Sequence, residues 1–236
     1  MAITLQDVYR RLSHNEFSNL LISDEGSGDI RDDKKEQVVS LINNALDQIF
    51  TRFPIRTDSV LIKIIEGRIE YELHPKWAFS NQALTDLGEP FIIDTPSRPF
   101  KGDVIKILSV KDQFNEELPL NEEGRFNSVF TPRYNVLAVT DHIKRDVLGI
   151  TYQAFHPLIF ATNSSIIVDI PRVILEPLAQ YVAHQYYKTK NTQESKAAAQ
   201  DHFNAYEMAC QRIDQNDLIG SMTMNSGSTF EMNGFV

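Results

Sequence analysis

Six histidines are the first candidates for chemistry, since imidazole serves both as a zinc ligand and as a general base. They are scattered over the sequence, at His14, His74, His142, His156, His184 and His202. No two have the HExxH spacing that places two imidazoles on one helix face beside a carboxylate base. A metal site assembled from distant residues is the alternative, but the spacing itself predicts no metal.

Nucleophiles and phosphate-binding loops also lack their usual motifs. No GxSxG turn presents a serine between a strand and a helix, and no GxxxxGK[ST] loop occurs. The glutamates of the run 116–123 could supply an acid and a base, but they lie in a turn with proline and glycine, which is typical of a solvated loop. The sequence therefore predicts no catalytic residues, no cofactor and no enzyme.

The single cysteine and a cluster of aspartates are two further candidates, and a structural role is expected for both. The single cysteine, Cys210, has helical spacing to apolar residues, which predicts a buried thiol rather than a nucleophile. The aspartates at 24, 29, 32 and 33 lack the regular alternation and the closing glutamate of a calcium loop, so a solvated turn is expected there.

Trp77 and Phe79, in the segment HPKWAF, form an aromatic pair in a predicted loop. Such a pair could be a platform for a sugar or an anchor at an interface. It could equally plug the core beneath the loop. The sequence leaves these interpretations open.

The clearest helix of the sequence begins near Asp33. Asp33 and Glu36 make a plausible capping pair, and Pro54 ends the helix. A shorter helix is expected before it, capped by Thr4 and running through about Leu12. Apolar residues recur in the longer helix at intervals of three and four, at Val38, Leu41, Ile42, Ala45, Leu46, Ile49, Phe50 and Phe53.

Residues 58–157 have the period of strands and form a predicted β-rich insertion. The segments VLIKIIE and RIEYEL, joined by a turn at Glu66 and Gly67, predict a β-hairpin because apolar and charged residues alternate in the second segment. Five further strand signals follow, in FIID, VIKILSV, SVFTP, YNVLAV and GITYQAF.

Helical spacing returns within residues 158–213. The first of two helices begins near Pro171, and Pro177 is expected to kink it about two turns in. The polar link KTKNTQES is short enough to make the two helices an antiparallel pair, and the helix that begins near Asp33 should complete the bundle. The second helix carries an apolar stripe at Ala199, Phe203, Tyr206, Cys210 and Ile213.

The predicted fold class is therefore α+β, an α-helical bundle with a large β-rich insertion and an extended C-terminal arm. The expected parts are the N-terminal helices (1–57), the insertion (58–157), the C-terminal helix pair (158–213) and a docking arm (214–236).

The composition narrows the class of protein. With 236 residues and 42% hydrophobic content the chain can bury a core, and no apolar run approaches the length of a membrane helix. The N-terminus is amphipathic and lacks a signal-peptide core, so synthesis in the cytoplasm is expected. A formal charge of −9 argues against a protein that grips nucleic acid, because such affinity comes from Lys and Arg.

The last residues pose a separate question. The segment 218–236 is too rich in Gly, Ser and Asn for a packed core, yet it contains several large apolar side chains. It has neither helical nor strand period, so its order must come from outside. The apolar residues are Met222, Met224, Phe230, Met232, Phe235 and Val236.

In this arrangement the chain resembles the head-to-tail adaptor proteins of tailed bacteriophages, and especially the tubular adaptor of short-tailed phages. The resemblance rests first on the helix EQVVSLINNALDQIFTRFP running into VLIKIIEGRIEYEL. It also rests on SVFTPRYNVLAV followed by GITYQAFHP, and on the ending PRVILEPLAQYVAHQYYKTKNTQESKAAAQDHFNAYEMACQRI. Together these segments cover most of residues 1–213.

The resemblance implies a virion structural protein at the head–tail junction, assembled as a ring of about twelve copies. Its partners would be the portal protein on one side and a tail or nozzle protein on the other. Genomic DNA would pass through the lumen without specific binding, and no membrane would be involved. The apolar residues of segment 218–236 would then be a hook that binds the portal.

Contacts between copies are expected at the C-terminal helix pair and at the insertion, through the residues Tyr187, Trp77 and Phe79. Tyr187 is predicted to lie on the surface beside the apolar stripe, and a small insertion with many strands would otherwise leave open edges. Two alternatives stay open at this point. One is another neck or tail-tube protein, and the other is a phage-encoded hydrolase that degrades the cell wall with residues distant in sequence.

Overall fold

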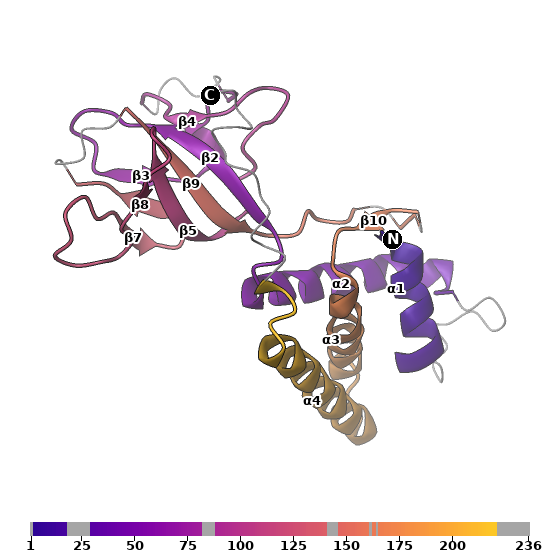
Figure 1. The fold of residues 1–236 in the computed structure, drawn as a ribbon. Coiled ribbons are helices and arrows are strands. Elements are labelled where there is room, and N and C mark those ends of the chain that lie inside the picture. The colour runs from indigo at the N-terminus through magenta and orange to yellow at the C-terminus, as the bar shows by residue number, and fades with distance from the viewer. Residues whose placement is uncertain are drawn as a thin grey trace. The chain divides into compact units, whose positions relative to one another are not determined.

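The computed structural model describes residues 2–17, 29–81, 88–140, 146–160, 162–163 and 165–220. They form two compact units, which adjoin in the sequence at residues 55/56 and 155/156. We call the described residues of 2–55 and 156–220 the helical unit, and those of 56–155 the β unit (Figure 1). The fold is α+β, as the sequence predicts.

The helical unit begins with a short strand and a capped helix. Strand β1 (Ile3–Thr4) pairs antiparallel with β10 (Ile167–Val168), and α1 (Leu5–Arg11) follows directly. Thr4 and Asp7 form a capping box, in which the Thr4 N–H donates to the Asp7 carboxylate at 2.8 Å and the Asp7 N–H donates to the Thr4 hydroxyl at 3.3 Å. The predicted cap is therefore confirmed. A π-helical turn, η1 (Leu12–Glu16), ends this segment.

The long helix α2 (Asp32–Arg52) buries the predicted apolar face and ends before Pro54. Its predicted cap is wrong. The N-cap lies two residues earlier, at Arg31, which makes no side-chain capping bond. Asp33 lies inside the first turn, where a negative charge favours the helix dipole, and its carboxylate accepts a hydrogen bond from Arg31 at 3.1 Å.

Two helices close the helical unit. A 3₁₀ turn, η4 (Arg172–Ile174), leads into α3 (Leu175–Lys188), and α4 (Gln193–Gln215) follows after a tight link with Thr192 as its cap. Helix α3 packs against both α4 and α2, which confirms the predicted bundle. The kink expected at Pro177 is wrong, because Pro177 lies in the first turn of α3, where its missing N–H breaks no helical bond.

The β unit contains two antiparallel sheets. The larger has the order β4-β2-β9-β5-β6, and the smaller has the order β3-β8-β7. The larger sheet consists of β2 (Thr57–Lys63), β4 (Ile92–Ile93), β5 (Val104–Asp112), β6 (Glu117–Leu118) and β9 (Val147–Ala154). The smaller consists of β3 (Glu70–Glu72), β7 (Phe130–Arg133) and β8 (Val136–Ala138). All five later strand signals are confirmed.

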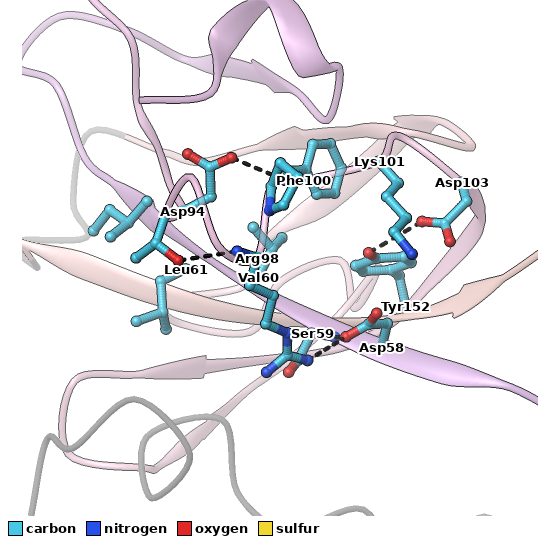
Figure 2. Close-up of a pocket in the computed structure, with 13 residues that line it drawn as sticks. Asp58, Ser59, Val60, Leu61, Asp94, Arg98, Phe100, Lys101, Asp103 and Tyr152 are labelled. Atoms are coloured by element: carbon cyan, nitrogen blue, oxygen red, sulfur yellow. Dashed lines mark hydrogen bonds and ion pairs between the residues drawn. The ribbon is translucent and has the colours of Figure 1, made fainter. Parts of the chain in front are cut away.

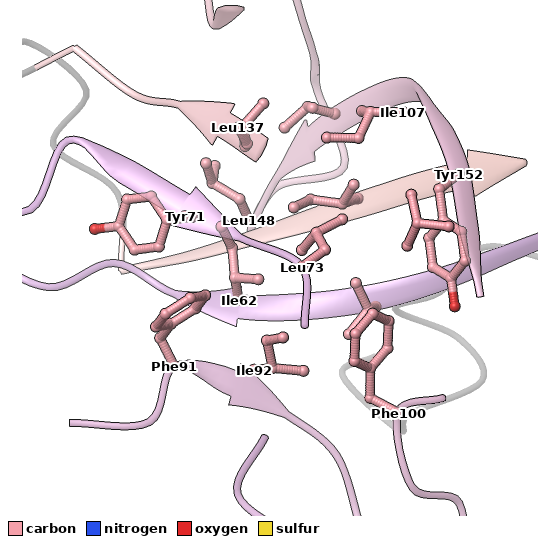
Figure 3. Packing of buried hydrophobic residues seen from close by; sticks show 14 of the residues in the cluster. Ile62, Tyr71, Leu73, Phe91, Ile92, Phe100, Ile107, Leu137, Leu148 and Tyr152 are labelled. Atoms are coloured by element: carbon pink, nitrogen blue, oxygen red, sulfur yellow. The ribbon is translucent and has the colours of Figure 1, made fainter. Parts of the chain in front are cut away.

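Both sheets contribute to one buried core. Ile62 of β2 and Leu148 of β9 come from the larger sheet, and Tyr71 of β3 and Leu137 of β8 come from the smaller (Figure 3). Two aromatic rings from loops, Phe91 and Phe100, close the same cluster. Every second residue along β2 and β9 belongs to this shared core, namely Val60 and Ile62 in β2 and Leu148, Ile150, Tyr152 and Ala154 in β9.

The predicted hairpin between β2 and β3 is wrong. Strand β2 pairs with β9 and β4, while β3 pairs with β8 in the other sheet. The turn at Gly67 exists, but it carries the chain from one sheet to the other. The Tyr71 hydroxyl fixes this crossing, since it accepts a hydrogen bond from the Ile65 N–H at 2.9 Å and donates to the Ile65 carbonyl at 3.2 Å.

Candidate functional site

A cavity of about 330 Å³ lies beside strand β2 in the β unit. Strand β2 pairs with β9 along all of Thr57–Lys63, whereas β4 pairs with β2 only at Leu61 and Ile62. Residues Asp58 to Leu61 therefore form one wall of the cavity, and the loop from Ile93 to Lys101 forms the other (Figure 2).

Hydrogen bonds to Asp94 hold the loop wall in place. The Asp94 carboxylate accepts from the Ser80 N–H at 2.7 Å and from the Phe100 N–H at 2.8 Å. Phe100 in turn packs edge-on against Tyr152 of β9, with ring centroids 6.0 Å apart. These contacts attach the loop to the rest of the β unit near both of its ends. The fold of the β unit therefore determines the shape of the cavity.

The charges around the cavity neutralise one another. Asp58 accepts from Arg98 at 3.1 Å and lies 3.5 Å from the guanidinium of Arg56. Arg56 also contacts the Asp103 carboxylate at 3.2 Å, and the Tyr152 hydroxyl donates to Asp103 at 3.4 Å. Burial raises the pKa of Tyr152, so this hydroxyl stays protonated as a donor. The carboxylates of Asp58 and Asp103 are therefore held in ion pairs.

The cavity is lined by both charged and apolar side chains. The hydroxyl groups of Ser59 and Thr95 are among the lining groups, but none of the lining residues is a histidine that could act as their base. Across the described residues, no group of three or more His, Cys, Asp or Glu side chains is arranged to hold a metal ion. Sequence reasoning missed this cavity. Its one signal was the pair of prolines, Pro96 and Pro99, which break the strand pattern after β4.

Trp77 packs onto the core of the β unit. Its ring stacks on Phe91 with centroids 5.5 Å apart, and the Arg68 guanidinium lies 4.5 Å from the Trp77 centroid. The indole N–H donates to the Glu72 carboxylate at 3.3 Å. Of the interpretations left open by the sequence, these contacts favour the core plug. Phe79 is partly exposed, and contact of either residue with another copy stays a prediction.

Tyr187 joins a network of polar groups between α3, α4 and η1. Its hydroxyl donates to the Glu16 carbonyl at 3.3 Å, and its ring stacks on His202 with an interplanar angle of 12°. The residue is thus partly buried, whereas the sequence predicts a surface position. Burial raises the pKa of its hydroxyl. Its place at a contact between copies stays a prediction.

A chain of side-chain hydrogen bonds runs through the same network. The Gln180 amide donates to the buried Glu16 carboxylate at 3.1 Å. The amide oxygen of Gln180 lies 2.8 Å from His202 Nδ1 and can only accept, so Nδ1 carries the hydrogen. Burial raises the pKa of Glu16 and lowers the pKa of His202. Both shifts favour the neutral forms, which suits a structural network.

Cys210 is fully buried on α4, as predicted. Burial raises the pKa of its thiol to about 11, so the reactive thiolate is scarce at neutral pH. The thiol is therefore part of the helix packing.

Several predicted residues lie outside the described part of the chain. They include His142 and the six residues expected to bind the portal, namely Met222, Met224, Phe230, Met232, Phe235 and Val236. Their roles stay predictions.

No protein-family model matches the sequence, and no curated protein matches it. Among the described residues, none of the helices has the length and apolar character that crossing a membrane requires.

Proposed function

We propose that the chain is a bacteriophage virion protein that forms the head-to-tail adaptor ring. In this role it binds the portal on one side and the tail or nozzle protein on the other, and genomic DNA passes through the ring. The observation that carries the proposal is the order of the elements. Helix α2 precedes the β unit and α3 and α4 follow it, so a β-rich unit is inserted into a helical one. The resemblance to tubular adaptors rests on this order.

Two further features support a structural role. Asp58 and Asp103 at the cavity are neutralised by Arg56 and Arg98, as in a packed wall, whereas a general acid or base requires a group free to exchange a proton. The charge of −9 also suits a conduit, because acidic walls repel the phosphates of DNA and let the duplex slide.

Native mass spectrometry and cryo-electron microscopy of the particle test the proposal together. We expect an assembly with about twelve times the chain mass of 27.0 kDa, located between the portal and the tail. Particles made without the protein serve as the control, and they should contain DNA-filled heads that lack tails. A copy that is monomeric both in solution and in the particle would contradict the ring.

The two alternatives give different results in the same experiments. A tail-tube protein would assemble into a ring but would lie away from the portal. A wall-degrading hydrolase would release soluble fragments from purified host cell wall, and we expect the purified protein to release none.

A further inference from the structure

A second recess, of about 490 Å³, lies between strands β5 and β7, which are both labelled in Figure 1. Residues Lys106 to Leu108 of β5 form one side of it. Residues Thr131 to Arg133 of β7, with Tyr134 after them, form the other. Strand β5 belongs to the larger sheet, and β7 is the last strand of the smaller sheet. The recess therefore lies between an edge of each sheet.

The β5 side of the recess is an open strand edge. On that edge, β6 pairs with β5 only at Val110 and Lys111. After β6 the chain turns away to the start of β7, where the Val129 N–H donates to the Pro119 carbonyl at 2.9 Å. Among the described strands, none pairs with residues 104–108 on the side opposite β9. The backbone N–H and C=O groups of such an edge are a template for one further strand.

The β7 side differs, because its backbone donors are already used or missing. The Thr131 N–H donates to the side-chain oxygen of Asn121 at 2.8 Å. The next residue, Pro132, has no N–H. An edge without free donors is a poor partner for another strand. The recess therefore offers an extended chain hydrogen bonds from β5 and side-chain contacts from β7.

Charge indicates what kind of chain fits the recess. Lys106 and Arg133 contribute two cations, and none of the lining residues is an Asp or Glu. Lys106 is exposed and, within the described residues, makes no ion pair. Arg133 lies 3.4 Å from Glu70, but both side chains are more than half exposed, so this ion pair is weak and exchangeable. Since a lysine on an open edge discourages pairing with uncharged strands, the strand that fits is acidic.

Two other occupants fit these groups less well. Two cations are fewer than nucleic acid requires, because that affinity comes from many phosphate contacts. The run of glutamates at 116–123 of a second copy is also a poor candidate, since it is already folded. The Glu116 N–H donates to Asp112 at 3.0 Å, and the Glu122 N–H donates to Ser128 at 3.2 Å. These bonds keep the run from entering the recess of another copy.

We propose that the recess between β5 and β7 binds an extended acidic segment of a partner protein, which adds as a strand to residues 106–108. The carboxylates of the segment pair with Lys106 and Arg133. Because side chains alternate along a strand, apolar residues between the acidic ones cover Tyr134, which is 65% exposed. The inference goes beyond the proposed function, and it holds for a single chain as well as for a ring.

The probe is a labelled peptide of about eight alternating Glu and Val residues, and fluorescence anisotropy with the full chain measures its dissociation constant. We expect Lys106→Glu to raise that constant about tenfold or more, because it reverses a charge that faces the carboxylates. Lys101→Glu is the matched control, since it makes the same charge change at the cavity beside β2. Both lysines are exposed, so both variants should unfold at the temperature of the wild type.

Two further measurements test the strand addition itself. N-methylation of the peptide at every Glu or at every Val removes the backbone donors of one edge only. We expect one of these two peptides to bind about tenfold or more weakly than the other. Hydrogen exchange of the full chain should become slower at residues 104–108 when the unmethylated peptide binds, and it should stay unchanged at residues 57–63.

Several outcomes would overturn the inference. They are no binding of the Glu–Val peptide, equal affinity for a Lys–Val peptide, equal binding by the wild type and Lys106→Glu, and equal loss with Lys101→Glu. Equal binding of the two methylated peptides, or unchanged exchange at residues 104–108, would exclude strand addition at β5. Self-association of the chain that Lys106→Glu abolishes would also contradict the inference, since the occupant would then be a second copy.

Discussion

At the scale of single residues, the neutral imidazole of His202 should make folding sensitive to pH. Burial lowers its pKa from 6.5, so the unfolded chain binds more protons than the folded chain as the pH falls below about 6.5. Stability from this group is therefore present above pH 6.5 and lost as the pH decreases. We expect His202→Gln to remove this part of the pH dependence, measured as the difference in free energy of unfolding between pH 7.5 and about 5.5.

Other titratable groups near His202 also affect the pH dependence of stability, so the measurement needs a control. Glu16 titrates with the opposite sign, because its raised pKa makes the folded state bind more protons above 4.5. Asp201 raises the pKa of His202 and His184 lowers it, but burial is the largest effect. The slope of the free energy of unfolding against pH is therefore compared between the wild type and His202→Gln. Identical slopes would show that the imidazole does not titrate in this range.

Trp77 gives a second prediction at this scale. Since its ring stacks on Phe91 and lies under Arg68, we expect Trp77→Ala to lower the free energy of unfolding by about 2 kcal/mol. Phe79→Ala, at a partly exposed neighbour, should cost less than about 1 kcal/mol. Chemical denaturation measures both. Unchanged stability of Trp77→Ala together with lost assembly would instead identify the ring as an interface anchor.

At the scale of elements, the entry into β5 depends on Gly102. Its φ of +72° is costly for other residues, and an added Cβ would lie 2.6 Å from Pro75 Cδ. Gly124 has a similar φ of +77° but no atom within 4 Å of an added Cβ, so it reports the backbone cost alone. We expect Gly124→Ala to cost about 1 kcal/mol and Gly102→Ala about 3 kcal/mol or more, measured by thermal unfolding.

Equal costs at the two glycines would show that the loop after Phe100 shifts away from Pro75 without strain. The cavity wall would then be adaptable, and the shape seen beside β2 would not be fixed by the fold.

The sequence predicted correctly those elements that depend on contacts between residues close in sequence. The cap at Thr4 needs only Asp7 three residues on, and the apolar stripe of α2 follows from helical period. Strand pairing is different. The alternation at Tyr71 shows that one face is buried, but not whether the partner strand is β2 or β8. The predicted hairpin failed for that reason.

Long-range contacts also explain why the site features were missed. The cavity joins Asp58 to Arg98, and Asn43 of α2 binds the backbone of Ile159, more than a hundred residues away in sequence. Asn43 is polar beside the apolar face of α2, which was the one available signal. A polar residue there predicts a hydrogen-bond partner, but the sequence does not say which one.

At the scale of the whole molecule, the C-terminal segment carries a prediction about attachment. Helix α4 continues to Gln215 and Ile219 is only 3% exposed, so the helical unit extends into the arm predicted at 214–236. A truncation should therefore begin after Gly220. We expect removal of residues 221–236 to leave the unfolding temperature unchanged and to weaken binding to the portal about tenfold or more, measured by co-sedimentation with portal rings.

A full-length variant with serine at all six apolar positions of that segment is the matched control. It keeps the length of the segment and should bind as weakly as the truncated chain. Portal binding as tight as that of the wild type would remove the hook interpretation, and loss of folding would place the segment in the core.

The insertion of the β unit into the helical unit has a consequence for synthesis. The β unit is continuous in sequence, so it can complete its core while the ribosome is still making the chain. Helix α2 emerges earlier but packs on α3, which follows the whole β unit. At about 5–20 residues per second, its apolar face waits on the order of ten seconds for that partner.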